Sequence, residues 1–240
     1  MRGIDISHWQ QGLDVGNILM DGLEFVILKI TDGGAYTDQS AAFNYTKAKT
    51  AGIPAGGYCY SHAVNAPQAR AEAAHILDTI MGFPMPLGLY LDVEEPEQLA
   101  LPHDVLMNVL IAWCDAIRAA GYIPGVYGSE GTLWAKIRPE ELPEDVLIWV
   151  AHYGKEPAIP CDIWQSSDRG VFPGYVGPVD VNEVQSDRFH RLVLEESAGD
   201  DTSTIEALCG IISEQAEIIK KQAAELERLR SLAKELEGKA

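Results

Sequence analysis

The sequence of 240 residues has few basic side chains and no long hydrophobic run. Its 18 Lys and Arg residues stand against 36 Asp and Glu residues, which gives a formal net charge of −18 at pH 7. Because proteins that contact nucleic-acid phosphates need basic patches, this balance argues against nucleic-acid binding and against capture by an anionic surface. No stretch of about 18 apolar residues is present, so insertion into a membrane is not expected.

Three further features are missing from the chain. The N-terminal segment MRGIDISHWQ has no apolar signal-peptide core, which predicts a protein that is made and initially kept in the cytoplasm. The four cysteines, Cys59, Cys114, Cys161 and Cys209, form no CxxC pair, so reduced thiols are expected rather than a structural zinc site. No glycine-rich phosphate loop follows the first expected strand, which argues against nucleotide binding. We therefore expect neither a metal nor a cofactor.

The chain does contain an alternation of short apolar segments and helix-like segments over residues 1–195, the expected first domain. Strands are expected at Gly3–Ser7, Phe25–Ile30, Pro54–Tyr60, Gly88–Val93, Pro124–Tyr127, Val146–Val150, Asp162–Gln165 and Val179–Asn182. Helices are expected at Ser40–Ala51, Pro67–Met81 and His103–Ala120, with a weaker one near Glu130–Ile137. This α/β alternation indicates a mostly parallel sheet, and eight strands favour a closed barrel over an open doubly wound sheet. The last third of the barrel should have few covering helices.

The pattern changes at ESAGDDTST, which predicts a linker at residues 196–203 and a long helix at residues 204–240. Apolar residues of this helix fall on the a and d positions of one heptad frame: Ile205, Leu208, Ile212, Ile219, Leu226, Leu229 and Leu236. Such a helix should pack on something, and self-association as a coiled coil, which would make the protein a homo-oligomer, is the first interpretation. Docking on the barrel or on a different partner is the alternative.

Acidic residues gather at several of the expected strands. Asp5 lies in the first strand, and Asp32 follows the second. Asp92 and Glu94 lie at the end of the fourth strand, and Asp180 lies in the eighth. Since the C-terminal strand ends of a parallel β/α barrel meet at one mouth, these acids should line a common, negatively charged cleft.

The segment GLYLDVEEP places two of these carboxylates on one side of a strand. Asp92 and Glu94 are separated by one residue, so their side chains point the same way, with Cβ atoms about 6.5–7 Å apart. Two close carboxylates in different environments are what glycoside hydrolysis requires, one as a proton donor and the other as a charged partner. Glu95 should point away from this pair. Loop caps or a magnesium site are the alternatives that spacing alone leaves open.

Several segments, taken together and in order, resemble one enzyme family. GIDISHWQ, FVILKITDG, AGIPAGGYCYSH, LYLDVEE, GVYGS, IWVAHYG, DIWQSS and VDVNEV are similar to the family 25 glycoside hydrolases, the Chalaropsis-type lysozymes, over residues 2–190. The resemblance implies a flattened, incomplete β/α barrel with eight strands. It also implies a muramidase that cleaves the β-1,4 bond between N-acetylmuramic acid and N-acetylglucosamine in peptidoglycan.

The resemblance also implies roles for single residues. Glu94 would be the general acid, Asp92 its partner carboxylate, and Asp5 and Asp180 further acids of the site. Retention of configuration is implied, with either Asp92 or the substrate's own N-acetyl group as the nucleophile.

Substrate contacts are expected from aromatic and amide side chains near the strand ends, namely Tyr58, Tyr60, Tyr90, Tyr127, Trp164, Gln165 and Asn182. Asp32 is added to this set, although the family often has Glu at its position. The family also often has His where this chain has Cys59, so any role of that His is absent here or has moved to His62.

The leading interpretation is a phage or prophage endolysin, an antimicrobial cell-wall hydrolase that remains in the host bacterial cytoplasm until release. Bacterial peptidoglycan is its expected partner. A non-catalytic wall-binding protein on the same fold is one alternative, but such a protein would not need the complete set of acids. A related barrel enzyme that cleaves chitin is the other alternative.

Overall fold

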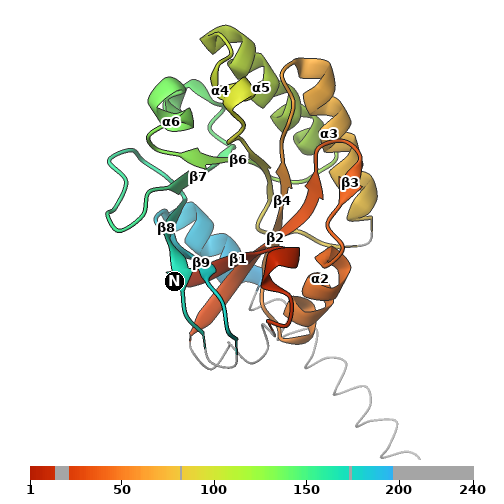
Figure 1. The fold of residues 1–240 in the computed structure, drawn as a ribbon, viewed down its shortest axis with the longest axis vertical. Helices are drawn as coiled ribbons and strands as arrows, with labels where there is room; N and C mark the ends of the chain where they lie inside the picture. The colour runs from red at the N-terminus through yellow and green to blue at the C-terminus, as the bar shows by residue number, and fades with distance from the viewer. Residues whose placement is uncertain (14–21, 82, 173–174, 197–240) are drawn as a thin grey trace, which may run out of the picture. The chain divides into compact units, whose positions relative to one another are not determined.

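The strands of this chain close into a barrel (Figure 1). The structure is a computed structural model that describes residues 1–13, 22–81, 83–172 and 175–196. In this part of the chain, eight strands form the closed ring: β1 (Arg2–Ile6), β2 (Leu23–Asp32), β4 (Ala55–Tyr60), β5 (Leu89–Asp92), β6 (Pro124–Ser129), β7 (Leu147–Ala151), β8 (Ile163–Gly170) and β9 (Val179–Val184). Because β1 pairs with both β9 and β2, the ring has no open edge there. The expected eight-stranded barrel is confirmed.

A short extra strand lies beside the ring. β3 (Tyr36–Thr37) pairs with the end of β2 as an antiparallel hairpin, and the sequence pattern does not predict it. At two residues it is too short to show a hydrophobic alternation.

Alternating side chains give each barrel strand one face toward the interior and one face toward the covering helices. In β2, Phe25 and Ile27 belong to the interior cluster, whereas Val26 packs in the outer core. The interior is tightly filled, because a Cβ atom on Gly125 of β6 would lie 2.3 Å from the ring of Tyr90. Glycine at this position therefore makes room for a large aromatic ring inside the barrel.

Three helices cover the outside of the barrel beside β2, β4, β5 and β6: α2 (Ala41–Thr50), α3 (Ala66–Thr79) and α5 (His103–Ala119) (Figure 1). The large buried residues of α5 recur three or four positions apart, as expected for a helix with one apolar face: Leu106, Val109, Leu110, Trp113 and Ile117. The weak helix expected near Glu130–Ile137 is a single turn, α6 (Leu133–Lys136). Three further short helical turns lie in the described residues: α4 (Pro96–Leu99), η1 (His8–Gln10) and η3 (Pro139–Glu141).

Residues 187–196 are helical and close one end of the barrel. Phe189 of this segment packs edge-on against Phe25, with the ring centroids 5.3 Å apart, and Val193 joins the same interior cluster. Phe25 lies near the start of β2, so the segment covers the end at which the parallel strands begin. The sequence pattern does not predict this helix. Its position leaves the opposite end of the barrel for a site.

Strand β9 runs antiparallel to both of its neighbours, β1 and β8, whereas the other ladders of the ring are parallel. The connection between β8 and β9 has eight residues, 171–178, and a parallel crossover needs about a dozen or more. Asp180 therefore approaches the mouth from the beginning of its strand. The expectation that it lies at a C-terminal strand end is wrong, although the expected mouth is the right one.

Residues 197–240, which contain nearly all of the expected linker and the whole expected helix at 204–240, lie outside the described residues. The expected coiled coil therefore stays a prediction. Within the described residues, no helix has the length and apolar character needed to cross a membrane.

Candidate active site

Four acidic side chains meet at the end of the barrel where the parallel strands finish. Asp5 of β1 lies directly opposite Asp180 in the ladder between β1 and β9. Asp92 is the last residue of β5, and Glu94 follows two positions later, on the same side of the chain. The charges of Glu94 and Asp5 act on Asp92, and the charge of Asp180 acts on Glu94. The structure thus gathers the four acids that the sequence singles out.

Asp5 is a buried carboxyl with hydrogen-bond donors on one oxygen. Its Oδ2 atom accepts hydrogen bonds from Asn182 Nδ2 at 2.7 Å and from Gln165 Nε2 at 2.9 Å. Burial and the neighbouring charge of Asp180 nevertheless raise the pKa of Asp5 to about 8. Burial and the charge of Asp168 raise the pKa of Asp180 to about 6. The two facing carboxyls therefore hold a proton to a higher pH than ordinary aspartates do.

Aromatic side chains hold these two amides in place. Tyr127 and Tyr153 donate hydrogen bonds to Gln165 Oε1, at 2.8 and 3.1 Å. Trp149 Nε1 donates to Asn182 Oδ1 at 2.8 Å. Because the amide oxygens accept these bonds, the NH₂ group of each amide is turned toward the buried carboxyl. The orientation of both donors is therefore set by the interior of the barrel.

Asp92 is buried to the same degree but lacks such donors. It is 5% exposed, and its Oδ1 atom has no hydrogen-bond partner among the described residues. Burial, the charge of Glu94 and the charge of Asp5 raise the pKa of this carboxyl well above its usual value. The charge of Lys29 acts in the opposite direction. Since a buried polar atom without a partner is costly, Oδ1 marks a place where a bound ligand can supply a donor.

Glu94 borders an open cleft. The cleft has a volume of about 570 Å³ and is lined by Glu94, Ser129, Glu130, Gly131, Ala151, His152 and Tyr153. The Glu94 side chain is accessible to solvent. Partial loss of hydration in the protein, and then the charges of Asp180 and Glu95, nevertheless raise its pKa. A carboxyl that retains its proton more readily than usual and faces open space suits proton donation to a bound molecule.

Three of the predicted contact tyrosines lie in or beside this acid cluster. Tyr58 packs edge-on against Trp149, with the ring centroids 6.2 Å apart, and is half-buried. Tyr60 is also half-buried and lies under the ammonium group of Lys29, 4.9 Å from its ring centroid. Tyr127 is 6% exposed and holds Gln165.

Two other predicted contacts lie elsewhere. Tyr90 is 0% exposed, and its hydroxyl donates to the Leu87 carbonyl at 2.7 Å, deep in the barrel interior. Trp164 precedes Gln165 on β8 and so faces the other side of the strand, where its Nε1 donates to the His152 carbonyl at 2.7 Å. Neither side chain is joined to the acids.

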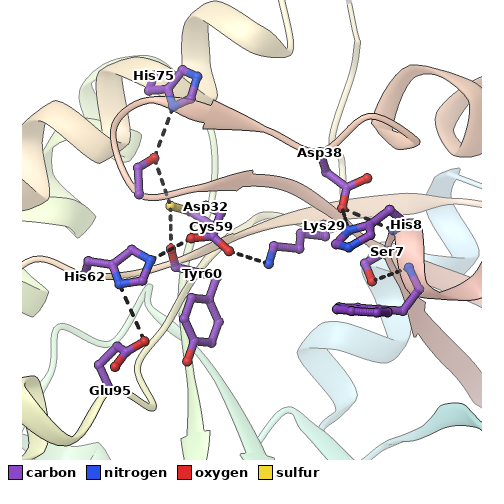
Figure 2. A network of polar contacts seen from close by, with 12 residues as sticks. Ser7, His8, Lys29, Asp32, Asp38, Cys59, Tyr60, His62, His75 and Glu95 are labelled. Atoms are coloured by element: carbon purple, nitrogen blue, oxygen red, sulfur yellow. Dashed lines mark hydrogen bonds and ion pairs between the residues drawn. The ribbon is translucent and has the colours of Figure 1, made fainter.

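Asp32 belongs to a chain of charged contacts beside the acids (Figure 2). It accepts hydrogen bonds from Lys29 Nζ at 2.7 Å, and its Oδ1 lies 2.6 Å from His62 Nε2. Partial burial alone would raise the pKa of Asp32, but these two partners hold it below its usual value. His62 Nδ1 in turn lies 3.5 Å from Glu95 Oε1, so Glu95 points to this chain rather than into the acid pair.

The position at which the family often has His is occupied by a core residue. Cys59 is 0% exposed and packs in the outer core, and burial raises the pKa of its thiol. His62 is half-exposed and contacts Asp32 and Glu95, so a histidine does lie near the site, three positions along the chain.

Sequence reasoning missed two residues of the site. Lys29 is in phase with Phe25 and Ile27 in LEFVILKITD, so the strand alternation already places a cation on the interior face. Tyr153 lies in the loop after β7, and no pattern in the sequence signals its contact with Gln165. Within residues 1–13, 22–81, 83–172 and 175–196, no group of three or more His, Cys, Asp or Glu is placed to hold a metal ion.

A closed barrel that carries two neighbouring carboxyls of different burial has the features of a glycoside hydrolase. The family model of the glycosyl hydrolases family 25 matches residues 4–175, which is more than half of the chain. The chain belongs to this family, the one that its sequence segments resemble.

Relatives and solved structures agree with this assignment. The chain is 31% identical to the autolytic lysozyme of Clostridium acetobutylicum, over 76% of this chain and 55% of that protein. It is 27% identical to lysozyme M1 of Streptomyces globisporus, over 81% of this chain and 71% of that protein. The catalytic domain of an endolysin from bacteriophage P40 of Listeria monocytogenes superposes with a TM-score of 0.68 at 25% identity, over 80% of this chain and 97% of that one. The match thus spans about half the length of the clostridial relative.

Proposed function

We propose that this chain is a muramidase that hydrolyses the β-1,4 bond between N-acetylmuramic acid and N-acetylglucosamine in peptidoglycan. The observation that carries the proposal is the acid pair at the barrel mouth, in which Asp92 is buried and Glu94 faces an open cleft. Membership of the glycosyl hydrolases family 25 and the lysozymes among its relatives support the same substrate class.

Glu94 is the general acid in this proposal. Its accessible position lets a glycosidic oxygen approach, and its raised pKa means that it holds its proton to a higher pH than an ordinary glutamate does. Asp92 is the partner carboxylate, because it interacts with Glu94 from the end of β5 and one of its oxygens has no hydrogen-bond partner among the described residues. Its negative charge would stabilise the positive charge that develops at the sugar carbon. Retention of configuration follows if Asp92, or an N-acetyl group that Asp92 orients, attacks that carbon.

Asp5 and Asp180 take supporting parts. Asp180 acts on Glu94 through its charge, so in its ionised form it adds negative potential near the developing positive charge. Asp5 is held by Gln165 and Asn182, and burial raises its pKa, so we assign these two amides to the support of Asp5.

Glycan contacts in this proposal come from the side chains that the structure brings to the mouth. Tyr58 and Tyr60 are half-buried and offer ring faces and hydroxyls beside the acids, a combination that suits sugar surfaces. Tyr127 is buried and acts through Gln165, to which its hydroxyl donates. Asp32 lies at the edge of the same mouth and borders a second hollow of about 450 Å³ with His62. Tyr90 and Trp164 are not included, since one is enclosed in the barrel and the other faces away.

Digestion of purified peptidoglycan tests the proposed activity. The full chain should release fragments with new N-acetylmuramic acid reducing ends, which mass spectrometry after borohydride reduction identifies. Chitin oligomers, treated in parallel, should remain intact. Cleavage of chitin oligomers without cleavage of peptidoglycan would point to the chitinase alternative, and wall binding without any cleavage would point to the non-catalytic alternative.

The biological setting is a further part of the proposal. A phage or prophage endolysin is supported by the likeness to the catalytic domain of an endolysin from bacteriophage P40. The heptad pattern of residues 204–240 supports a homo-oligomer that engages the wall through several barrels at once. Light scattering of the full chain should therefore give a mass at least twice the 26.2 kDa of one chain. A mass of one chain at micromolar concentration would contradict the oligomer.

A further inference from the structure

One buried lysine lies beside the acids of the mouth. Of the Lys and Arg side chains that the structure describes, Lys29 is the one that is buried, at 8% exposure. A lysine is rarely buried unless its charge is paired. Lys29 is in phase with the inward-facing Phe25 and Ile27 of β2, so its side chain enters the barrel rather than the outer core.

The ammonium group of Lys29 is directed across the neighbouring strand. Its Nζ atom lies 4.9 Å from the ring centroid of Tyr60, and Tyr60 is the ladder partner of Asp92 between β4 and β5. Strands β2 and β5 are two positions apart in the ring, about 10 Å at the usual strand spacing. Tyr60, which the ammonium group contacts, lies on β4 between Lys29 of β2 and Asp92 of β5, and the charge of Lys29 acts on Asp92.

A chain of contacts fixes this charge (Figure 2). Asp32 binds Lys29 Nζ at 2.7 Å, and His62 binds the other oxygen of Asp32 at 2.6 Å. The backbone N–H of His62 donates to Glu72 Oε1 at 2.9 Å, and Ser61 Oγ donates to Glu72 Oε2 at 2.6 Å. These bonds attach the loop after β4 to helix α3. Lys29 is thus linked through Asp32 and His62 to a loop that is anchored on the helix.

Among the described residues, the other charged groups with the largest effects on Asp92 oppose its ionisation. The groups that interact with this carboxyl are Asp5, Asp32, Glu94, Lys29, Tyr58, Cys59, Tyr60 and Tyr127. Within this group Lys29 supplies the positive charge, whereas the acids are like charges and the tyrosines and the thiol are neutral. Burial adds to the cost of the anion.

We propose that Lys29 is the positioning residue that allows the buried Asp92 carboxyl to ionise, and that Asp32 and Tyr60 hold its ammonium group for this purpose. The inference rests on the proposed function, in which Asp92 must be an anion when positive charge develops on the sugar. Without the lysine, a proton stays on Asp92 to a higher pH, and the pair cannot present one acid and one base.

Substitution of Lys29 tests this role through the pH dependence of the reaction. Lys29→Met removes the charge, so the pKa of Asp92 rises and more alkaline solution is needed to ionise it. The acid limb of the kcat/KM profile should therefore move up by about one pH unit or more, the effect of losing a nearby opposite charge. At pH values above the acid limb, the KM of Lys29→Met should stay within about threefold of the wild-type KM, because the substrate-contacting side chains are unchanged. Lys29→Arg should restore most of the wild-type profile, because it keeps the cation.

Matched controls separate this role from a structural one. Lys49→Met removes a positive charge from an exposed position on α2 and should leave the profile unchanged. A purely structural role of Lys29 would lower activity equally at all pH values, together with the melting temperature. If Lys29→Met does not fold, Lys29→Gln, which can still hydrogen-bond Asp32, should give the same upward displacement. The proposal is overturned if a folded Lys29→Met or Lys29→Gln variant keeps the acid limb of its kcat/KM profile at the wild-type pH.

A measurement without substrate distinguishes this proposal from the proposed function. Carboxyl ¹³C NMR can follow the titration of Asp92, with Asp92→Asn used to assign its signal. The titration should move to higher pH in Lys29→Met and stay in place in Lys49→Met. That result in a protein without muramidase activity would support the role of Lys29 while contradicting the function. Muramidase activity, together with an Asp92 titration that is the same in Lys29→Met and wild type, would support the function while contradicting the role of Lys29.

Discussion

The two acids buried at the barrel mouth, Asp5 and Asp92, meet the cost of burial in different ways. Asp5 has an oxygen that accepts from both Gln165 and Asn182, and aromatic side chains orient these amides. Asp92 keeps an oxygen without a partner among the described residues and has the charge of Lys29 acting on it. The hydrogen bonds to the Asp5 carboxyl on the side of β1, β8 and β9 are therefore in place, whereas the Asp92 carboxyl on the side of β2, β4 and β5 keeps one oxygen free of a donor among the described residues.

The largest effect is expected from Asp92→Asn. Catalytic turnover should fall by a factor on the order of 10²–10³, the usual result of removing one charge-stabilising group. Stability should be unchanged or higher, because a neutral amide replaces a buried acid among like charges. Turnover of peptidoglycan and urea unfolding measure the two quantities. Asp78→Asn, at an exposed position on α3, is the control. A large loss of stability together with the loss of activity would show that contacts within the folded protein stabilise the Asp92 carboxyl, as they do for Asp5.

Asn182→Ala, in contrast to Asp92→Asn, should lower the stability of the folded protein. It removes a donor from Asp5 and leaves Trp149 Nε1 without its acceptor, so two buried polar groups lose a partner. A loss of about 1–3 kcal/mol in the free energy of unfolding is expected. Denaturant unfolding measures it, with Asn108→Ala on the exposed face of α5 as the matched control. Equal stability of the two variants would show that the amide support is dispensable.

The pH dependence of stability should reveal Asp5. The folded chain holds a proton on Asp5 up to about pH 8, whereas an unfolded Asp releases it near pH 4, so this group lowers stability as pH rises between these values. Asp5→Asn cannot titrate, so its stability relative to wild type should improve by up to about 1.4 kcal/mol per pH unit. Urea unfolding at pH 5 and pH 7.5 tests this. A constant difference between the two proteins would mean that Asp5 ionises normally.

The smallest effect is expected from His62→Gln. His62 contacts Asp32 and Glu95 but its side chain is 50% exposed, so solvent screens both interactions. The free energy of unfolding should change by less than about 1 kcal/mol, as for other exposed ion pairs. Thermal and denaturant unfolding provide the measurement, with Lys49→Met as the surface control. A loss above about 2 kcal/mol would show that the contact chain around Asp32 behaves as a buried network.

Much of the barrel could be predicted because its strands carry their own signals. The segment LEFVILKITD lies between Gly22 and Gly33 and contains the uninterrupted apolar run FVIL, as a strand with apolar side chains on both faces should. Strand direction has no such signal, so the antiparallel course of β9 was missed. The length of the connection before β9 was the available clue. The helix at 187–196 was missed because Phe189 and Val193 form too short a periodic pattern to stand out.

Those parts of the site could be predicted for which the alternation of side chains along a strand was taken into account. Acids at strand ends identified the mouth, because such positions in a barrel face one opening. The same phase rule would have excluded Trp164, which alternates with Gln165, and would have placed Tyr90 one layer deeper than Asp92. It would also have found Lys29. The contact of Tyr153 depends on the path of a loop, which tertiary packing decides and local sequence does not.

The most direct test of the central claim compares Glu94→Gln with Glu97→Gln in the release of N-acetylmuramic acid reducing ends. Both variants exchange one carboxyl for an amide, but Glu97 lies at an exposed position on α4, outside the lining of the cleft. With Glu94 as the general acid, Glu94→Gln should release ends about 10²–10⁴ times more slowly than Glu97→Gln, at equal thermal stability. Release by Glu94→Gln within a few fold of the control would contradict the assignment of the open carboxyl as the proton donor.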